Sequence, residues 1–134
     1  MKHRLYRMFL FPAICFAITI ILFRCAFLIG IVPTASMEPT IPAGAVVLGN
    51  RTAYWFSEPQ VGDIVIFRHD AKTLIKRVAA TAGQTIMHHG VALIVPDGCV
   101  YLLGDCPEAS VDARFWPNPF VSCHLVLAKF LFKF

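Results

Sequence analysis

Charged side chains are scarce in this chain, and its first 33 residues contain no acidic one. Only 15% of the 134 residues are charged, and all eight Asp and Glu lie beyond Pro33. Four of the twelve Lys and Arg flank an apolar N-terminal stretch, and the other eight balance the acidic residues. The part beyond Pro33 is formally neutral and lacks the concentrated positive charge of a nucleic-acid-binding surface, so we expect no nucleic-acid partner.

Metal-ligand patterns are also absent from the sequence. The five cysteines include no Cys-x-x-Cys pair and join no histidines at metal-ligand spacing. His88 and His89 are adjacent, so in a strand they would point to opposite sides and could not readily share a metal, and we expect them to be loop or surface residues. We therefore expect no metal and no other cofactor. Outside the cytoplasm a disulfide is permitted among Cys99, Cys106 and Cys123; the first two are nearest in sequence, but spacing does not fix the pairing.

A long helical pattern is missing beyond Pro33, where no uninterrupted one of ten or more residues occurs. Short β-branched or apolar runs alternate instead with turns that contain Pro and Gly. The runs are 45–48, 64–67, 74–79, 91–95, 100–103 and 125–132. The pattern predicts a mostly β protein, with a single compact antiparallel β domain at residues 29–134. The polar stretch 68–73 suits a hairpin connection between two of the strands.

The N-terminal region is dominated by an apolar stretch, residues 9–32, interrupted only by Thr19 and Arg24. As a helix, the part of this stretch before Arg24, residues 9–23, covers about 22 Å, which is short of a hydrocarbon core of about 30 Å. Extending the helix to Leu28, with Arg24 reaching the headgroups, closes the gap. Residues 9–28 are therefore predicted to form one transmembrane helix.

The basic residues before this helix predict its orientation. Lys2, Arg4 and Arg7 favour the cytoplasm, so residues 1–8 are expected there and everything after the helix on the opposite side. A cleavable signal peptide is the alternative interpretation, because the basic start, the apolar run and small residues near Ala35 fit its outline. Pro33, three positions before that cleavage point, argues against it and favours a permanent anchor.

A nucleophilic serine needs a base, and the five histidines occur in no arrangement that links one to a serine and an acid. A lysine can serve if its amine is neutral, which requires lowering its pKa by roughly 3 units, or about 4 kcal/mol. Desolvation on an apolar face can supply this. Strand periodicity places Lys76 on one face with Leu74 and Val78, and Arg77 on the other. Lys76 is therefore the candidate base; the alternative is a strand lysine that reaches water.

Four segments stand out in order along the chain: residues 33–40 (PTASMEPT), 62–67 (GDIVIF), 74–78 (LIKRV), and 104–105 (GD) followed by Ser110, Asp112 and Arg114. Together they resemble the sequence boxes of type I signal peptidases. One such segment alone would be weak evidence, but four in the same order cover nearly the whole region beyond the apolar stretch. The resemblance implies a membrane-anchored serine endopeptidase with signal-peptidase-like coiled β-sheets, which removes N-terminal signal peptides from exported preproteins.

The roles of the reacting groups carry over from this resemblance. Ser36 is expected to attack the scissile carbonyl, and a neutral Lys76 to accept its proton and later protonate the leaving amine. The Ser36 backbone N–H and the Thr34 hydroxyl are expected to form the oxyanion hole, which is worth roughly 3 kcal/mol per donor.

The last box implies supporting roles. Ser110 resembles the serine that orients the lysine, and Asp112 and Arg114 resemble an ion pair that shapes the site. The chain departs from the family's pattern here, because Cys106 stands where Asn is usual and Ala113 replaces a Ser. These differences leave the expected dyad untouched and indicate that the loop 106–114 is adjusted differently from that of the family.

Substrate pockets are expected to be shallow and apolar, because signal peptides carry small residues at the −3 and −1 positions and bind as an added strand. The resemblance suggests Val32, Met37, Leu74 and Ile75, each of which is equally interpretable as core. Aromatic clusters at 54–56 and 115–117 stand in loop-like segments; one of them enters the lipid interface, or both pack in the core.

Lys76 also bears on the compartment, because members of the archaeal and endoplasmic-reticulum branch have His at this position. It indicates a bacterial plasma membrane, or as second choice a mitochondrial inner membrane. The expected partners are preproteins with signal peptides and membrane lipid, and the protein is expected to be a monomer.

Three alternatives to this function remain. A specialised peptidase of the same clan that matures pilin or conjugation-system precursors shares the dyad and differs only in substrate. A non-catalytic membrane β protein is disfavoured because Ser36, Lys76, Thr34 and Ser110 are all present. A soluble, self-cleaving, repressor-type Ser-Lys protein is disfavoured by the apolar anchor and the absence of a helical DNA-binding segment.

Overall fold

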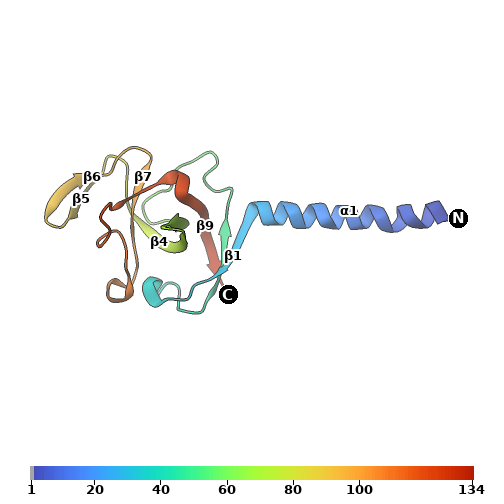
Figure 1. Cartoon of the computed structure of the whole chain (residues 1–134), viewed down its shortest axis with the longest axis horizontal. Helices are drawn as coiled ribbons and strands as arrows, with labels where there is room; N and C mark the ends of the chain where they lie inside the picture. Colours follow the sequence, from blue (N-terminus) through green and yellow to red (C-terminus); the bar gives the residue numbers. More distant parts are fainter. Residues whose placement is uncertain (1) are drawn as a thin grey trace.

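The computed structural model describes residues 2–134 as one long helix attached to a small β domain (Figure 1). Helix α1 (Lys2–Ala26) projects away from the domain and touches it only at its C-terminal end. Its segment Met8–Ala26 is long and apolar enough to cross a membrane, with a mean hydropathy of 2.2 and none of it buried against the protein. The helix thus ends two residues before the expected boundary at Leu28.

The helix ends there because the next residues pair in the sheet. Strand β1 (Phe27–Ile31) lies antiparallel to β2 (Val46–Asn50), with Phe27 opposite Asn50 and Ile31 opposite Val46. The backbone N–H of Arg51, just after β2, donates to the carbonyl of Ala26 (2.8 Å) and so satisfies one free carbonyl at the helix end. Helix and sheet therefore join without an intervening loop.

Seven strands form one curled antiparallel sheet in the order β1-β2-β9-β3-β4-β7-β8. The remaining strands of this sheet are β3 (Ile64–His69), β4 (Lys72–Thr81), β7 (Cys99–Leu103), β8 (Phe120–Ser122) and β9 (Val126–Lys133). The expected fold class, a mostly β protein with an antiparallel domain and one N-terminal helix, is confirmed.

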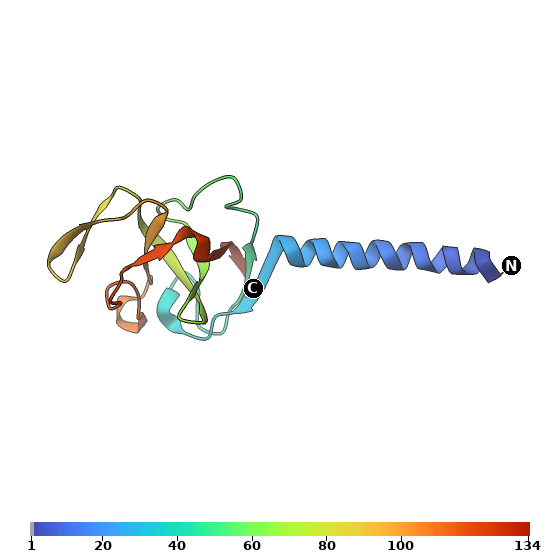
Figure 2. The same ribbon diagram turned by 45° about the horizontal axis from the view of Figure 1, so that its top comes forward.

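A separate hairpin of β5 (Thr85–His88) and β6 (Val91–Ile94) lies at the end of the domain farthest from α1 (Figure 2). Of its two histidines, which were expected in a loop or at the surface, His88 ends β5 and His89 lies in the exposed turn. Its φ is +49°, and its ring lies 4.2 Å from that of His88. Among residues 2–134, no group of three or more His, Cys, Asp or Glu is arranged to hold a metal ion.

The connection between β3 and β4 is shorter than the polar stretch 68–73 suggests. The two strands remain paired as far as His69 and Lys72, so only Asp70 and Ala71 form the turn. Both have positive φ, +45° and +63°, the combination that a type I′ hairpin turn requires. Ala71 adopts this conformation without being glycine, which strains its backbone.

The central strands β3 and β4 are covered on both faces, which gives the domain two apolar clusters. Along β3, Val65 and Phe67 belong to the first cluster, and Ile64 and Ile66 to the second. This follows from the alternation of side chains along a strand. Lys76, in the middle of β4, is consequently surrounded by protein.

All five cysteines are free. Cys99 lies opposite Ser122, the neighbour of Cys123, whereas Cys106 follows the other end of β7. The pair that is nearest in sequence is therefore not the pair that the sheet brings together.

Candidate active site

Ser36 lies in a short 3₁₀ turn (Ala35–Met37) that follows β1. Met37 and Ile41 are completely buried in the second apolar cluster and anchor this segment. The N–H of Ile41 donates to the carbonyl of Met37 (2.8 Å), and the N–H of Cys106 donates to the carbonyl of Ser36 (3.1 Å). The nucleophile candidate is thus held from both sides, with only 4% of its surface exposed.

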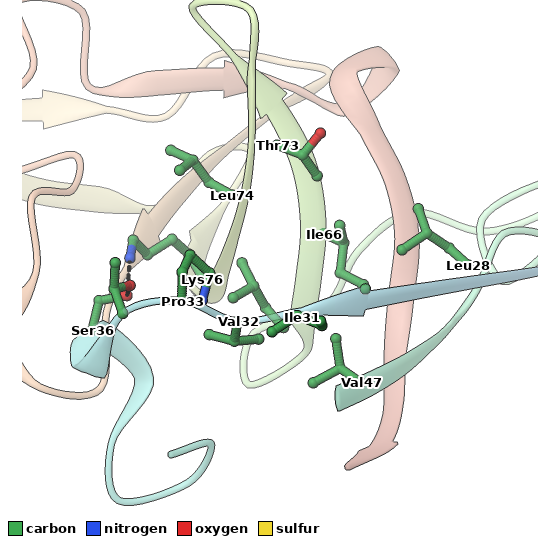
Figure 3. Close-up of a pocket in the computed structure, with 13 residues that line it drawn as sticks. Leu28, Ile31, Val32, Pro33, Ser36, Val47, Ile66, Thr73, Leu74 and Lys76 are labelled. Atoms are coloured by element: carbon green, nitrogen blue, oxygen red, sulfur yellow. Dashed lines mark hydrogen bonds between the residues drawn. The ribbon is translucent and has the colours of Figure 1, made fainter. Parts of the chain in front are cut away.

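Lys76 reaches Ser36 from the middle of β4, 40 residues further along the chain. Its Nζ donates to Ser36 Oγ at 2.6 Å, and its side chain is only 4% exposed (Figure 3). Lys76 lies opposite Val65 of β3, in the region that is covered on both faces. The sheet therefore brings the two residues singled out from the sequence into direct contact.

Burial is the main influence on the Lys76 amine, and it lowers the pKa of Lys76 below the usual lysine value. The nearby carboxylates of Asp112 and Asp105 oppose this shift, while the guanidinium of Arg114 adds to it. The net direction is downward, which is the direction that a general base requires.

The carboxylate of Asp112 is fully buried and saturated with donors. It accepts hydrogen bonds from Arg114 (Nε 2.8 Å, Nη2 2.6 Å), from the Gly104 N–H (2.9 Å) and from Ser110 Oγ (2.7 Å). Burial raises the pKa of Asp112, but these hydrogen bonds outweigh it and lower its pKa to about 2. Asp112 is therefore ionised and already neutralised by Arg114 instead of by the lysine.

Ser110 is buried beside Asp112, but it donates to this carboxylate, and within residues 2–134 no hydrogen bond joins it to Lys76. The backbone approaches closely here: a Cβ on Gly104 would overlap the Ser110 side chain and lie 2.6 Å from the carbonyl oxygen of Ser36. Glycine at this position lets the loop that carries Ser110 and Asp112 pack against the turn that carries Ser36.

A second ion pair was not identified from the sequence. Arg77 binds Asp105 through two hydrogen bonds (Nε to Oδ1 2.7 Å, Nη2 to Oδ2 2.6 Å), and the Thr40 hydroxyl donates to Asp105 Oδ2 (2.6 Å). Arg77 lowers the pKa of Asp105, and Asp105 raises that of Arg77. This bridge ties the segment after the nucleophile to β4 and to the end of β7. Arg77, Asp105 and Thr40 all lie within the four sequence segments described above. Their membership of these segments is the signal by which the bridge could have been found from the sequence.

The dyad lies at the end of a cavity of about 130 Å³ between β1 and β4 (Figure 3). Its lining includes three of the expected pocket residues, Val32, Leu74 and Ile75, together with Thr34, whose hydroxyl lies 3.3 Å from Ser36 Oγ. Met37 does not line it, because its side chain points into the second apolar cluster. The cavity is small and mostly apolar.

The aromatic clusters differ in their surroundings. Trp116 is 7% exposed and stacks on His69 with ring centroids 3.9 Å apart, so it is part of the core. Trp55 is 65% exposed and lines a surface cavity with Cys25, in the last turn of α1. Only the cluster at 54–56 is therefore exposed next to the end of the apolar helix.

Comparison with known proteins gives one family match. The family described as signal peptidase, peptidase S26, matches residues 4–95, a segment that contains both Ser36 and Lys76. The chain is 29% identical to the probable signal peptidase I-1 of Synechocystis sp., over 77% of this chain and 68% of the relative. It is 34% identical to the mitochondrial inner membrane protease subunit 1 of Mus musculus, over 73% and 63%.

A more local similarity is found with the signal peptidase I of Aquifex aeolicus, which is 40% identical over 41% of this chain but only 23% of the relative. The chain thus spans about two thirds of the cyanobacterial relative and less than a quarter of this one.

Proposed function

The chain belongs to the signal peptidase S26 family, and on this premise we propose that it is a membrane-bound serine endopeptidase that cuts signal peptides from preproteins. We assign the chemistry to Ser36 and Lys76. The observation that carries this assignment is the 2.6 Å contact between Lys76 Nζ and Ser36 Oγ at a buried position.

In the proposed reaction, neutral Lys76 takes the proton of the Ser36 hydroxyl as Ser36 Oγ bonds to the scissile carbonyl carbon. The resulting ammonium gives this proton to the leaving amine when the peptide bond breaks. A water molecule, deprotonated by the same amine, then hydrolyses the acyl-enzyme. The Ser36 N–H and the Thr34 hydroxyl are the proposed donors to the oxyanion, each worth roughly 3 kcal/mol.

The arginine pairs support a neutral lysine in this scheme. A buried ammonium is disfavoured, and it would persist only if a free carboxylate compensated its charge. Arg114 and Arg77 bind the two carboxylates whose charge acts on Lys76, Asp112 and Asp105. Burial is therefore the dominant influence on the pKa of Lys76.

We propose that the substrate binds in extended form between β1 and the first half of β4. β1 lies at one end of the sheet, and β4 pairs with β7 only from Arg77 onward, so both strands have a free edge beside the cavity. An added strand can use these backbone groups, as in other β-augmentation complexes. The small apolar cavity lined by Val32, Leu74 and Ile75 favours small side chains at the −3 and −1 positions.

For the membrane arrangement, we propose a single-pass topology with the basic N-terminus in the cytoplasm and the β domain on the other side of a bacterial plasma membrane. The 19-residue segment Met8–Ala26 spans about 28 Å as a helix, close to a hydrocarbon core of about 30 Å. The excess of Lys and Arg before it supports the orientation.

Cleavage of a preprotein by the parent chain and by Ser36→Ala and Lys76→Ala variants across pH tests this function. Parent activity should rise with pH through the depressed pKa of Lys76, because only the neutral amine accepts a proton. Each variant should lose at least about 10³-fold in rate. Arg68→Ala is the control, because Arg68 is exposed on the neighbouring strand β3 and forms no ion pair among residues 2–134, and it should keep full activity. Full activity in either dyad variant contradicts the proposal.

A further inference from the structure

A second cavity lies where α1 meets the β domain, away from the dyad. It has a volume of about 310 Å³, at the lower end of the roughly 300–1,000 Å³ that is typical of small-ligand sites. Its lining combines the end of the helix, the start of β1 and the turn after β2: Phe23, Arg24, Phe27, Leu28, Ile29 and Arg51. Two arginines thus line a cavity that has no acidic residue in its lining.

Arg51 is fixed against the end of α1 by two hydrogen bonds. Its backbone N–H donates to the carbonyl of Ala26 (2.8 Å), and its Nε donates to the carbonyl of Phe27 (3.2 Å). These bonds explain why the side chain stays at the helix end, where a cation is also favoured by the helix dipole. They do not use the two terminal nitrogens of the guanidinium, for which residues 2–134 supply no acceptor.

The positive charge at this position is not compensated by the described part of the chain. Arg77 and Arg114 each bind a carboxylate at 2.6 Å, whereas neither Arg24 nor Arg51 forms an ion pair among residues 2–134. An adjoining cavity of about 380 Å³ shares Arg51 and adds His124, again without an acidic residue in its lining. An anion from outside the protein is therefore the natural partner of these groups.

The position along α1 indicates which anion this is. The apolar span ends at Ala26, so Arg24 and Arg51 lie where hydrocarbon gives way to lipid headgroups. A guanidinium matches the oxygens of a phosphate through two parallel hydrogen bonds. Phe23 and Phe27 add apolar surface that suits the beginning of an acyl chain. We propose that Arg24 and Arg51 together bind the phosphodiester of an anionic phospholipid in the leaflet that faces the β domain.

Such a lipid would hold the domain at a fixed height above the bilayer. Arg51 is bonded to the carbonyl of Phe27, the first residue of β1, and β1 continues into the cavity beside Ser36. Binding a phosphate here therefore fixes the strand that lines the proposed substrate site.

The test is a titration of the full chain in neutral detergent with dioctanoyl phosphatidylglycerol, with binding measured by thermophoresis. Carrying it out in the Ser36→Ala variant makes the result independent of the proposed peptidase activity. Dioctanoylglycerol has the same acyl chains without the phosphate, and inorganic phosphate has the anion without the chains. Saturable binding is expected for phosphatidylglycerol only.

Arg24→Gln and Arg51→Gln should each weaken this binding about fivefold. Arg68→Gln is the matched control, because Arg68 is exposed, forms no ion pair among residues 2–134 and lies outside both cavities, and it should have no effect. The side chain of Arg24 makes no hydrogen bond within the described residues, so its variant keeps the test valid if Arg51→Gln unfolds. Parent-like binding by Arg24→Gln, or equal weakening by Arg68→Gln, overturns the proposal. Displacement of the lipid by an equal concentration of inorganic phosphate shows that the site takes free phosphate and that the lipid assignment is wrong.

Discussion

The pKa of the Lys76 ε-amino group depends on two influences, burial and the surrounding charges. Burial lowers its pKa, and the carboxylates of Asp112 and Asp105 raise it. Arg114 acts in the same direction as burial, both by its own charge and by binding Asp112. The pKa of Lys76 therefore depends on Arg114, although the two side chains form no hydrogen bond within residues 2–134.

Replacing Arg114 by Gln should make the enzyme less active at neutral pH. The variant leaves the Asp112 charge uncompensated, which raises the pKa of Lys76 and so reduces the fraction of neutral amine. The pH-rate profile should move to higher pH, with a loss of about three- to tenfold at pH 7 that alkaline buffer restores. Arg114→Lys should keep most of the activity because it keeps the charge. A shift of the profile to lower pH contradicts this account.

The role of a single residue could be predicted from the sequence where the residue belongs to a recognisable motif. It could not be predicted where the role depends on a partner that is distant in the sequence. Ser36 and Lys76 belong to motifs, whereas the bridge from Arg77 to Asp105 joins residues 28 positions apart. Met37 was assigned to a pocket because an apolar residue next to a nucleophile suits both a pocket and the core. Only the direction of the side chain, which points into the second apolar cluster, separates the two.

Among the elements, the β3–β4 hairpin carries a strained turn directly before the strand of Lys76. Ala71 has a φ of +63°, a conformation that costs a residue with a Cβ about 1–2 kcal/mol and costs glycine little. Ala71→Gly should therefore raise the free energy of unfolding by about 1 kcal/mol, measured by urea denaturation of the full chain in detergent. Asp-Gly is also the pair that type I′ turns favour.

Ala92→Gly is the control for this prediction. Ala92 is exposed in β6 and has no positive φ, so glycine there should lower stability by about 0.5–1 kcal/mol. Equal destabilisation by both glycine substitutions would show that the turn is not strained at Ala71.

Strand prediction succeeded where β-branched and apolar residues form a run between turn residues, as in 64–67 and 74–79. It missed β1, because its apolar sequence continues that of the helix and nothing local marks the change to a strand. Pairing with β2 determines that boundary, and pairing is not visible in the sequence. β8 was missed because a strand of three residues is too short to show a period.

For the molecule as a whole, one of its two tryptophans is exposed at the end of the domain that adjoins α1. Trp55 lines a cavity with Cys25 of the last helical turn, whereas Trp116 belongs to the core. We therefore expect Trp55, and not Trp116, to enter the lipid interface. An experiment that replaced both tryptophans could not separate a loss of membrane contact from unfolding of the domain, because removing a core Trp costs about 3–5 kcal/mol of stability.

The matched experiment keeps the full chain in vesicles that contain brominated phosphatidylcholine, a collisional quencher of tryptophan. Fluorescence of the parent should be quenched substantially, and quenching should fall by at least half in Trp55→Phe, which retains only Trp116. Undiminished quenching in that variant contradicts the placement of Trp55 at the interface.

The central claim is that the Lys76 amine is neutral at working pH, and a direct titration of this group tests it. The chain has only five lysines, so the ¹³Cε signal of Lys76 in the labelled full chain can be assigned by its loss in Lys76→Ala. We predict for Lys76 a titration midpoint well below the ordinary lysine value of about 10.4. A Lys76 signal that keeps its charged-form shift through neutral pH and titrates at the ordinary lysine value would contradict the claim.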